Sequence, residues 1–172
     1  MTLASEIHGF SAEIVEHLRQ RGETISTAES LTAGSVSAAI VTVAGASDVF
    51  VGGLTAYRDE IKISHLDIDP ALIEKHTVIS EEVAVAMAKG ANKSFGTTWA
   101  IATTGVAGPG PSDGIPSGTV WVAIDGPVTQ SLELSLAGGR ESVRNATVAT
   151  AIGTFTRILR ERARQAITEK LD

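Results

Sequence analysis

Three side chains in this sequence, Ser30, Tyr57 and Lys62, are of the types needed for hydrolysis through an activated hydroxyl. A serine hydroxyl is a poor nucleophile until a neighbouring base takes its proton. A lysine can be that base where burial in a poorly solvated pocket favours the neutral amine. Lys62 is flanked by Ile61 and Ile63, so we expect it to be the lysine held in this way. The combination indicates a hydrolase.

The histidines offer no comparable base. His8 and His17 fall on an amphipathic first helix, and His65 and His76 stand singly in polar surroundings. These positions form neither a histidine–aspartate pairing for a triad nor a metal-ligand spacing, so we predict no metal site. The sequence has no cysteine. This excludes disulfides, thiolate metal sites and a cysteine nucleophile, and it is consistent with a cytoplasmic location.

Ser30 falls between a predicted strand and a predicted helix. β-Branched residues gather at 24–27, and small and apolar residues recur at helical spacing over 35–41. A turn of this kind points backbone N–H groups at a bound ligand, which makes residues 32–34 candidate substrate contacts. A serine here is also a common helix N-cap, which is the alternative role for Ser30.

Tyr57 and Lys62 follow an apolar stretch over residues 49–56. We expect Asp59 to be the N-cap of a short helix that begins after this stretch. Tyr57 then lies at the end of a strand, and Lys62 lies near the first helical turn. Like Ser30, both residues are therefore expected where a strand gives way to a helix.

A loop rich in glycine and proline follows the apolar strand predicted at 99–104. It runs to Gly118 and includes Gly105, Gly108 and Pro109. Glycines allow backbone N–H groups to approach a ligand closely, and prolines limit the entropy lost when a loop is ordered, so such a loop can form an oxyanion or anion site. An ordinary long connection is the alternative. A dinucleotide-binding fingerprint is not indicated, because Pro109 prevents the helix that should begin there.

Gly138, Gly139 and Arg140 lead into the last predicted helix. Free N–H groups, the helix dipole and a guanidinium all favour a phosphate or carboxylate at such a position. The alternative is a surface salt bridge from Arg140 to Glu141 or Asp172.

Helices and strands alternate along the chain, which is typical of an α/β layered fold. A first helix carries an apolar stripe from Ile7 to Leu18 and ends at Gly22. Two further helices are predicted to open at Asp69-Pro70 and at Ser80. Strands are predicted at Thr119–Asp125 and Val128–Leu136, joined by a hairpin at Asp125-Gly126-Pro127. A final helix is predicted from Arg140 to Lys170. Because the closing hairpin is antiparallel, we predict a three-layer α/β/α sandwich around a mixed β-sheet, as one domain over residues 1–172.

Composition limits the partners. The chain has 172 residues, 43% of them hydrophobic, and a net charge of −6 without a clustered lysine and arginine stripe. A polyanion requires concentrated positive charge, so direct nucleic-acid binding is not expected. There is neither a signal-peptide pattern nor an apolar run of bilayer length, so we expect no membrane association. The small apolar segment 33–43 is either core or a subunit contact, and a homodimer is the default expectation.

Taken together, the motifs resemble the CinA C-terminal domain family, whose domain also occurs alone as nicotinamide-nucleotide amidohydrolase. The resemblance covers nearly the whole chain. It rests on Thr27-Ala-Glu-Ser30-x-Thr32-x-Gly34, on the spacing of Tyr57 and Lys62, and on Gly105-Val-Ala-Gly108-Pro109 followed by Pro116-x-Gly118-Thr119-Val120-Trp121.

The resemblance implies a reaction and a set of roles. The reaction is deamidation of nicotinamide mononucleotide, a small-molecule pyridine nucleotide, to nicotinic acid mononucleotide with release of ammonia and without a cofactor. Ser30 is implied as nucleophile, Lys62 as base and Tyr57 as assisting phenol. Thr104 matches a small hydroxyl position in the pocket, and Arg140 matches an arginine near the substrate phosphate, for which Arg144 is the other candidate. The full set of expected substrate contacts is Thr32, Ala33, Gly34, Thr104, Gly105, Gly108 and Arg140.

The sequence also departs from the family's pattern. The family usually has glycine at Ala33, serine and asparagine at Arg58 and Asp59, serine at Thr104 and aspartate at Gly139. Ala33 adds a methyl group in the turn where the backbone is expected to approach substrate. The changes at Ala33 and Gly139 support an alternative function, a noncatalytic nucleotide-binding or protein-interaction domain.

Overall fold

A mixed sheet of five strands organises the molecule, in the order β2-β1-β3-β4-β5. β1 pairs in parallel with both β2 and β3, whereas the pairs β3–β4 and β4–β5 are antiparallel. The computed structural model describes residues 2–168. The strands are β1 (Ile25–Glu29), β2 (Phe50–Thr55), β3 (Trp99–Gly105), β4 (Thr119–Asp125) and β5 (Gln130–Ser135).

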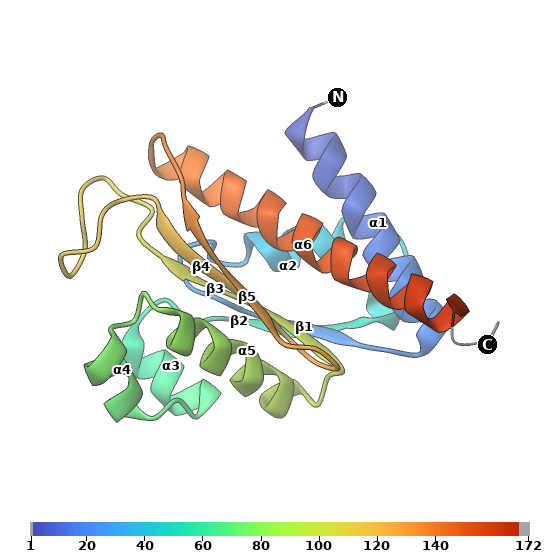
Figure 1. Cartoon of the computed structure of the whole chain (residues 1–172), viewed down its shortest axis with the longest axis horizontal. Coiled ribbons are helices and arrows are strands. Elements are labelled where there is room, and N and C mark those ends of the chain that lie inside the picture. Colours follow the sequence, from blue (N-terminus) through green and yellow to red (C-terminus); the bar gives the residue numbers. More distant parts are fainter. Residues whose placement is uncertain (1, 169–172) are drawn as a thin grey trace.

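Helices cover both faces of this sheet, which confirms the predicted three-layer α/β/α sandwich (Figure 1). One layer contains α1 (Leu3–Arg21), α2 (Ser35–Val41) and α6 (Arg140–Thr168). The other contains α3 (Asp59–Leu66), α4 (Pro70–His76) and α5 (Glu81–Phe95), and a 3-10 turn, η1 (Ala46–Asp48), precedes β2. The predicted end of the last helix at Lys170 lies outside the described residues.

The two faces of the sheet are packed differently. Large side chains fill the α1/α2/α6 side, where Trp99 and Phe155 meet edge to face with ring centroids 5.2 Å apart. Small residues dominate the α5 side, for example Ala28 and Ala102. At Gly90 an added Cβ would lie 2.3 Å from the Leu66 carbonyl oxygen, so this glycine lets α3 lie directly against α5. The close approach fixes α3, and with it Lys62, against the body of the protein.

Most element ends follow the predicted signals. Gly22 ends α1 at φ 62°, Asp69 caps α4 by accepting from the Ala71 N–H, and Ser80 caps α5. The predicted N-cap at Asp59 is wrong, because Arg58 is the N-cap of α3 and makes no side-chain cap hydrogen bond. Asp59 is instead the first helical residue, and its carboxylate turns to Lys62.

The last strand is shorter than predicted. β5 begins at Gln130 rather than Val128, because residues 126–129 are used to reverse the chain. The hairpin between β4 and β5 is nevertheless antiparallel as expected, with Val122 opposite Leu132.

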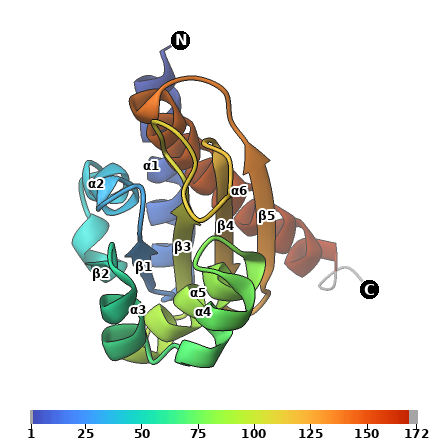
Figure 2. The same ribbon diagram turned by 90° about the vertical axis from the view of Figure 1, so that its left-hand side faces the viewer.

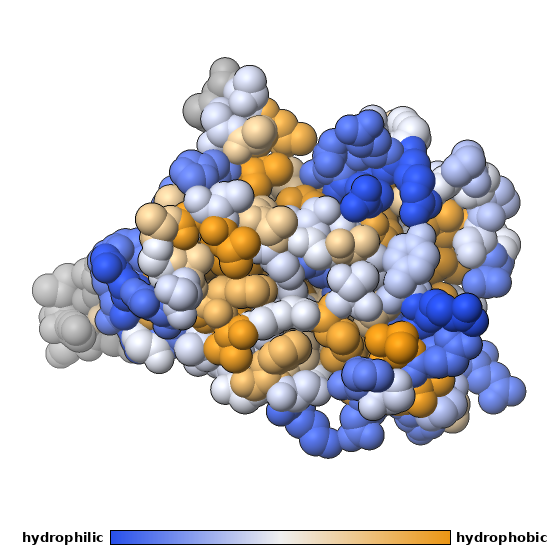
Figure 3. Space-filling model, turned by 180° about the vertical axis from the view of Figure 1, so that it is seen from behind, coloured by the Kyte–Doolittle hydropathy of each residue, from blue (hydrophilic) through white to orange (hydrophobic). Residues whose placement is uncertain are grey.

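The short helix α2 has one buried side and one exposed side. Val36 and Ile40 are buried in the core, whereas Val41 is exposed, as is Val51 on the edge strand β2. Seen from behind, apolar surface is interspersed with hydrophilic surface across the molecule (Figure 3). The segment thus contributes Val36 and Ile40 to the core, while Ala33, Ala38, Val41 and Thr42 are exposed. Within residues 2–168, the helices lack the combination of length and apolar character needed to cross a bilayer.

Because β1, β2 and β3 are parallel, their carboxyl ends meet at one edge of the sheet. The turn after Ser30, the segment that carries Tyr57 and the long loop 106–118 all start there. Figure 2 faces this edge, with the loop drawn in yellow in front of the strands. The candidate chemical groups are brought to one place by the sheet topology.

Candidate active site

A cavity of about 320 Å³ lies at this edge of the sheet. Its lining includes seven of the residues expected from the sequence, namely Ser30, Tyr57, Lys62, Thr104, Gly105, Gly108 and Arg140. Thr32, Ala33 and Gly34, the other expected contacts, do not line it. Four segments that are distant in sequence therefore supply one site, while the turn after Ser30 contributes less of it than predicted.

Ser30 lies directly after β1 and is 9% exposed. Its N–H donates to the Thr103 carbonyl oxygen at 2.9 Å, which continues the pairing of β1 with β3 beyond the strand end. Within the described chain, the Ser30 hydroxyl takes part in no hydrogen bond. Ser30 is not the N-cap of α2, since that position is Gly34. The hydroxyl is therefore free to meet a ligand in the cavity.

The carboxylate of Glu29 explains why most of the turn faces away from the cavity. It is buried and accepts hydrogen bonds from the N–H groups of Gly34, Val36 and Ser37 at 2.9, 3.0 and 2.8 Å, and from the Ser37 hydroxyl at 2.7 Å. The amino end of α2 is thus neutralised by the protein's own carboxylate. The expectation that this turn presents its N–H groups to a ligand is therefore wrong for Gly34.

Arg144 holds the same turn from the other side. Its Nε donates to the Leu31 carbonyl oxygen at 2.9 Å, and its Nη2 donates to the Thr32 carbonyl oxygen at 3.0 Å. The Ala33 N–H donates to the Ser30 carbonyl oxygen at 3.1 Å. A hydrogen bond to a carbonyl oxygen also fixes the direction of the next residue's N–H group, because the two groups share one peptide plane and point in opposite directions in a trans peptide. In the described structure the N–H groups of Leu31 and Thr32 remain without an acceptor.

Lys62 is 1% exposed, on the inner side of α3. Its ammonium nitrogen lies 3.2 Å from Asp59 Oδ1 and 3.4 Å from the Tyr57 carbonyl oxygen. It makes no hydrogen bond to Ser30 in the part of the chain that the structure describes. The sequence reasoning assigned no site role to Asp59, although a carboxylate three residues before a lysine on a helix is a known pairing signal.

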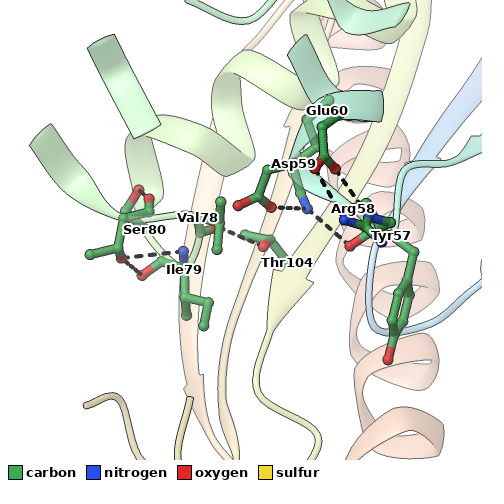
Figure 4. Close-up of polar contacts among 10 residues, drawn as sticks. Tyr57, Arg58, Asp59, Glu60, Val78, Ile79, Ser80 and Thr104 are labelled. Atoms are coloured by element: carbon green, nitrogen blue, oxygen red, sulfur yellow. Dashed lines mark hydrogen bonds and ion pairs between the residues drawn. The ribbon is translucent and has the colours of Figure 1, made fainter. Parts of the chain in front are cut away.

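The Tyr57 ring points away from the Asp59 carboxylate and is 52% exposed (Figure 4). Its phenolic oxygen accepts a hydrogen bond from Arg140 Nη2 at 2.8 Å, and Arg140 Nη1 donates to the Gly108 carbonyl oxygen at 2.9 Å. Arg140 thus joins the first residue of α6 to the loop and to the end of β2. Its contacts are these rather than the alternative salt bridge to Glu141, and Asp172 lies outside the described residues.

Thr104 is buried at the end of β3, and its hydroxyl donates to the Val78 carbonyl oxygen at 2.6 Å (Figure 4). The single hydroxyl proton is committed to that bond. Thr104 can therefore accept a hydrogen bond from a ligand but is not positioned to donate one to an oxyanion. In the loop that follows, Gly108 adopts φ +87°, and an added Cβ would lie 2.4 Å from the Ser117 hydroxyl, so glycine is required there.

Charge on the outer side of α3 is separate from the cavity. The Arg58 guanidinium donates to Glu60 at 3.1 Å, and this hydrogen bond lowers the pKa of the Glu60 carboxyl. Both side chains are exposed and neither lines the cavity. Among residues 2–168, there is also no group of three or more histidine, aspartate or glutamate side chains that could hold a metal ion.

Comparisons with known proteins identify the family of the chain. The family model of the CinA C-terminal domain matches residues 8–159. A CinA-like protein of Prochlorococcus marinus is 37% identical over 159 residues, which are 90% of this chain and 37% of that protein. A CinA-like protein of Parasynechococcus marenigrum is 41% identical over 153 residues, covering 86% of this chain and 36% of that protein. The chain thus spans about a third of the length of these relatives.

Solved structures show the same fold. A competence damage-inducible protein A from Klebsiella pneumoniae superposes with a TM-score of 0.84 at 32% identity, covering 88% of this chain and 95% of that one. A competence/damage inducible protein from Agrobacterium tumefaciens superposes with a TM-score of 0.85 at 30% identity, covering 90% and 96%. With the matched family model, these similarities establish that the chain belongs to the CinA C-terminal domain family.

Proposed function

We propose that the protein is an amidohydrolase that converts nicotinamide mononucleotide to nicotinic acid mononucleotide and ammonia. The observation that carries the proposal is the meeting of Ser30, Lys62 and Arg140 in one cavity of a CinA C-terminal domain. An unpaired hydroxyl, a buried amine and a guanidinium supply a nucleophile, a base and an anion receptor, which are the groups that hydrolysis of a phosphorylated amide requires.

The proposed reaction uses these groups in turn. Neutral Lys62 takes the Ser30 proton, directly or through the Tyr57 hydroxyl, and the serine oxygen attacks the carboxamide carbon. Lys62 returns the proton to the departing ammonia, which leaves an acyl-enzyme. A water molecule activated in the same way releases the acid and restores Ser30.

The developing oxyanion needs donors that are already in place. The Leu31 N–H is the candidate, because Leu31 lines the cavity, its N–H lacks an acceptor in the described chain, and its peptide plane is fixed by the hydrogen bond from the Ala33 N–H to the Ser30 carbonyl oxygen. Donors of this kind contribute ~3 kcal/mol each to transition-state stabilisation. Thr104 is not assigned this role, since its proton is donated to Val78.

Arg140 is the better candidate for the substrate phosphate. Arg144 is engaged by the Leu31 and Thr32 carbonyl oxygens, and its Nη2 also lies 3.3 Å from the Ser35 hydroxyl. Arg140 lines the cavity and donates to neutral oxygens of Tyr57 and Gly108, which a phosphate can replace as stronger acceptors.

The catalytic sequence requires one rearrangement. The Lys62 amine is paired with Asp59 in this structure and must turn to the Ser30 hydroxyl. That pairing is the observation that favours the second candidate function, a noncatalytic nucleotide-binding or interaction domain.

Ammonia release from nicotinamide mononucleotide separates the two candidates. The wild-type protein is expected to release ammonia, and Ser30→Ala is expected to lose at least ~10⁴-fold in kcat with an unchanged melting temperature, because the nucleophile is absent. Turnover that survives in the folded Ser30→Ala variant would refute the nucleophile. A wild-type protein that binds the nucleotide without releasing ammonia would instead establish the noncatalytic role.

A further inference from the structure

Asp59 is a charged residue of the cavity to which the proposed reaction gives no task. It is the first residue of α3, it lines the cavity together with Ser30, and its side chain is 50% exposed. One carboxylate oxygen, Oδ1, lies 3.2 Å from the Lys62 ammonium. Among the described residues, the other oxygen accepts no hydrogen bond and is open to a ligand.

The charged groups of the cavity lie at opposite ends of Tyr57. The Asp59–Lys62 pair lies by the Tyr57 backbone, since Lys62 also donates to the Tyr57 carbonyl oxygen. Arg140 lies at the opposite end of the same residue, where it donates to the phenolic oxygen. Figure 4 shows the Tyr57 ring extending away from Asp59. The cavity therefore offers a carboxylate at one end and a guanidinium at the other.

The balance of charge changes in the reacting form. With Lys62 protonated, the Asp59–Lys62 pair is neutral. When Lys62 is the neutral base that the proposed mechanism needs, the Asp59 carboxylate keeps its negative charge without a compensating cation beside it. An uncompensated carboxylate in a partly buried cavity favours a cationic ligand over a neutral one of the same shape.

We propose that Asp59 is a specificity-determining residue that selects amides carried on a positively charged ring, such as an N-substituted pyridinium, over neutral-ring analogues. The inference rests on the proposed function, because it assigns the ring of the substrate to the end of the cavity that holds Lys62. A ring cation beside Asp59 also replaces the Lys62 ammonium as the partner of the carboxylate. Substrate binding then frees the Lys62 amine to turn to Ser30.

Nicotinamide mononucleotide and its reduced form are a matched pair of ligands for the test. Both carry the carboxamide, the ribose and the phosphate, but the reduced ring is uncharged. Binding is measured by calorimetry in the Ser30→Ala background, where turnover does not interfere. The oxidised nucleotide is expected to bind about tenfold more tightly than the reduced one, which is the scale of one partly exposed charge contact.

Two further substitutions, added singly to this background, locate the preference. Asp59→Asn keeps the shape of the side chain and removes its charge, so the two ring forms are expected to bind within about twofold of each other. Glu60→Gln is the control, because Glu60 is the next residue, carries the same charge, pairs with exposed Arg58 and lies outside the cavity. It is expected to keep the tenfold preference.

The inference is overturned if Asp59→Asn retains the preference, if Glu60→Gln loses it as well, or if the Ser30→Ala protein does not distinguish the ring forms. Its failure is separable from that of the proposed function. Ammonia release by the wild-type protein together with an Asp59-independent preference removes only the inference. A charge preference that depends on Asp59 in a protein without ammonia release supports the inference and removes only the amidase. If neither nucleotide binds and the wild-type protein releases no ammonia, both the inference and the amidase are removed.

Discussion

The two halves of the candidate site are held in different ways. The turn after Ser30 is fixed from two sides, by four hydrogen bonds to the Glu29 carboxylate and by Arg144 on two successive carbonyl oxygens. The Lys62 amine has only the longer contacts of 3.2 and 3.4 Å to Asp59 and Tyr57. The difference matches the proposed tasks, since an oxyanion site acts best when it is preorganised, whereas a base must move between proton donors.

Of the variants that compare the two halves, those in the proposed mobile half, which holds the Lys62 base, have the largest expected effect. Lys62→Met removes the amine at similar volume and is expected to lower kcat for ammonia release by ~10³-fold, which is within the range of general-base catalysis. Lys62→Arg is expected to be nearly as inactive, because a guanidinium stays protonated and cannot accept the serine proton. Steady-state kinetics with both variants measure this effect.

A thermal unfolding curve accompanies each Lys62 variant, because arginine is larger than the buried lysine. A folded Lys62→Arg variant that keeps activity within tenfold of wild type would show that positive charge, rather than basicity, is what the site needs at this position.

The fixed half is tested at Arg144. Arg144→Met leaves the Leu31 carbonyl oxygen without its donor, whereas the Thr32 carbonyl oxygen keeps the Ser35 N–H at 3.1 Å, so the peptide between Leu31 and Thr32, next to the proposed oxyanion donor, is free to turn. We expect kcat to fall by ~10²-fold while KM changes little, because the lost interaction is made mainly in the transition state. Hydrogen exchange in the segment after Ser30 should become faster in the same variant.

Arg144→Lys is the conservative control, since a lysine can reach one carbonyl oxygen but not both in the forked geometry of arginine. It is expected to recover part of kcat. Changes of similar size in kcat and KM, together with unchanged hydrogen exchange in the turn, would contradict the positioning role of Arg144.

Tyr57 lies between the two halves and has a smaller expected effect. Tyr57→Phe removes the acceptor of the Arg140 hydrogen bond but keeps the ring. If the phenol relays the serine proton, kcat falls by ~10²-fold. We expect a loss of only about threefold, because the ring is half exposed and its oxygen is turned to Arg140 rather than to Lys62. Steady-state kinetics decide between a relay and a packing role.

The fold could be predicted from sequence because its signals are local. The Asp125-Gly126-Pro127 hairpin specifies an antiparallel end to the sheet, and Asp69 and Ser80 mark their helices within a few residues. The positions of Ser30 and Lys62 relative to strand ends were predictable for the same reason. The predicted role of Asp59 as N-cap was wrong. Its position at the start of the helix fits a cap, but its spacing of three residues from Lys62 also fits an ion pair, and the ion pair forms because Lys62 is buried beside it.

The remaining site contacts depend on long-range packing. Arg144 reaches a carbonyl oxygen 113 residues away in sequence, and the Thr104 hydroxyl is turned to Val78, 26 residues away. Local propensity carries no information on such partners, because they are set by how α6 and the loop before α5 pack on the sheet. The role of Glu29 in holding the turn was not predicted, although Glu29 is next to Ser30. The direction in which its carboxylate points depends on where α2 packs.

The smallest expected effect tests how firmly the fixed half is built. Ala33 adopts φ +51°, a left-handed conformation that costs a residue with a Cβ about 1 kcal/mol relative to glycine. Ala33→Gly relieves that strain but adds freedom to the unfolded chain, so we expect the free energy of unfolding to rise by at most ~0.5 kcal/mol. Because Ala33 lies outside the cavity and its turn is held by Glu29 and Arg144, kcat and KM should stay within twofold of wild type. Denaturant unfolding and steady-state kinetics measure the two quantities. A change in kcat of tenfold or more would mean that the turn follows its own backbone preferences rather than the hydrogen bonds around it, and the contrast between a fixed half and a mobile half would no longer hold.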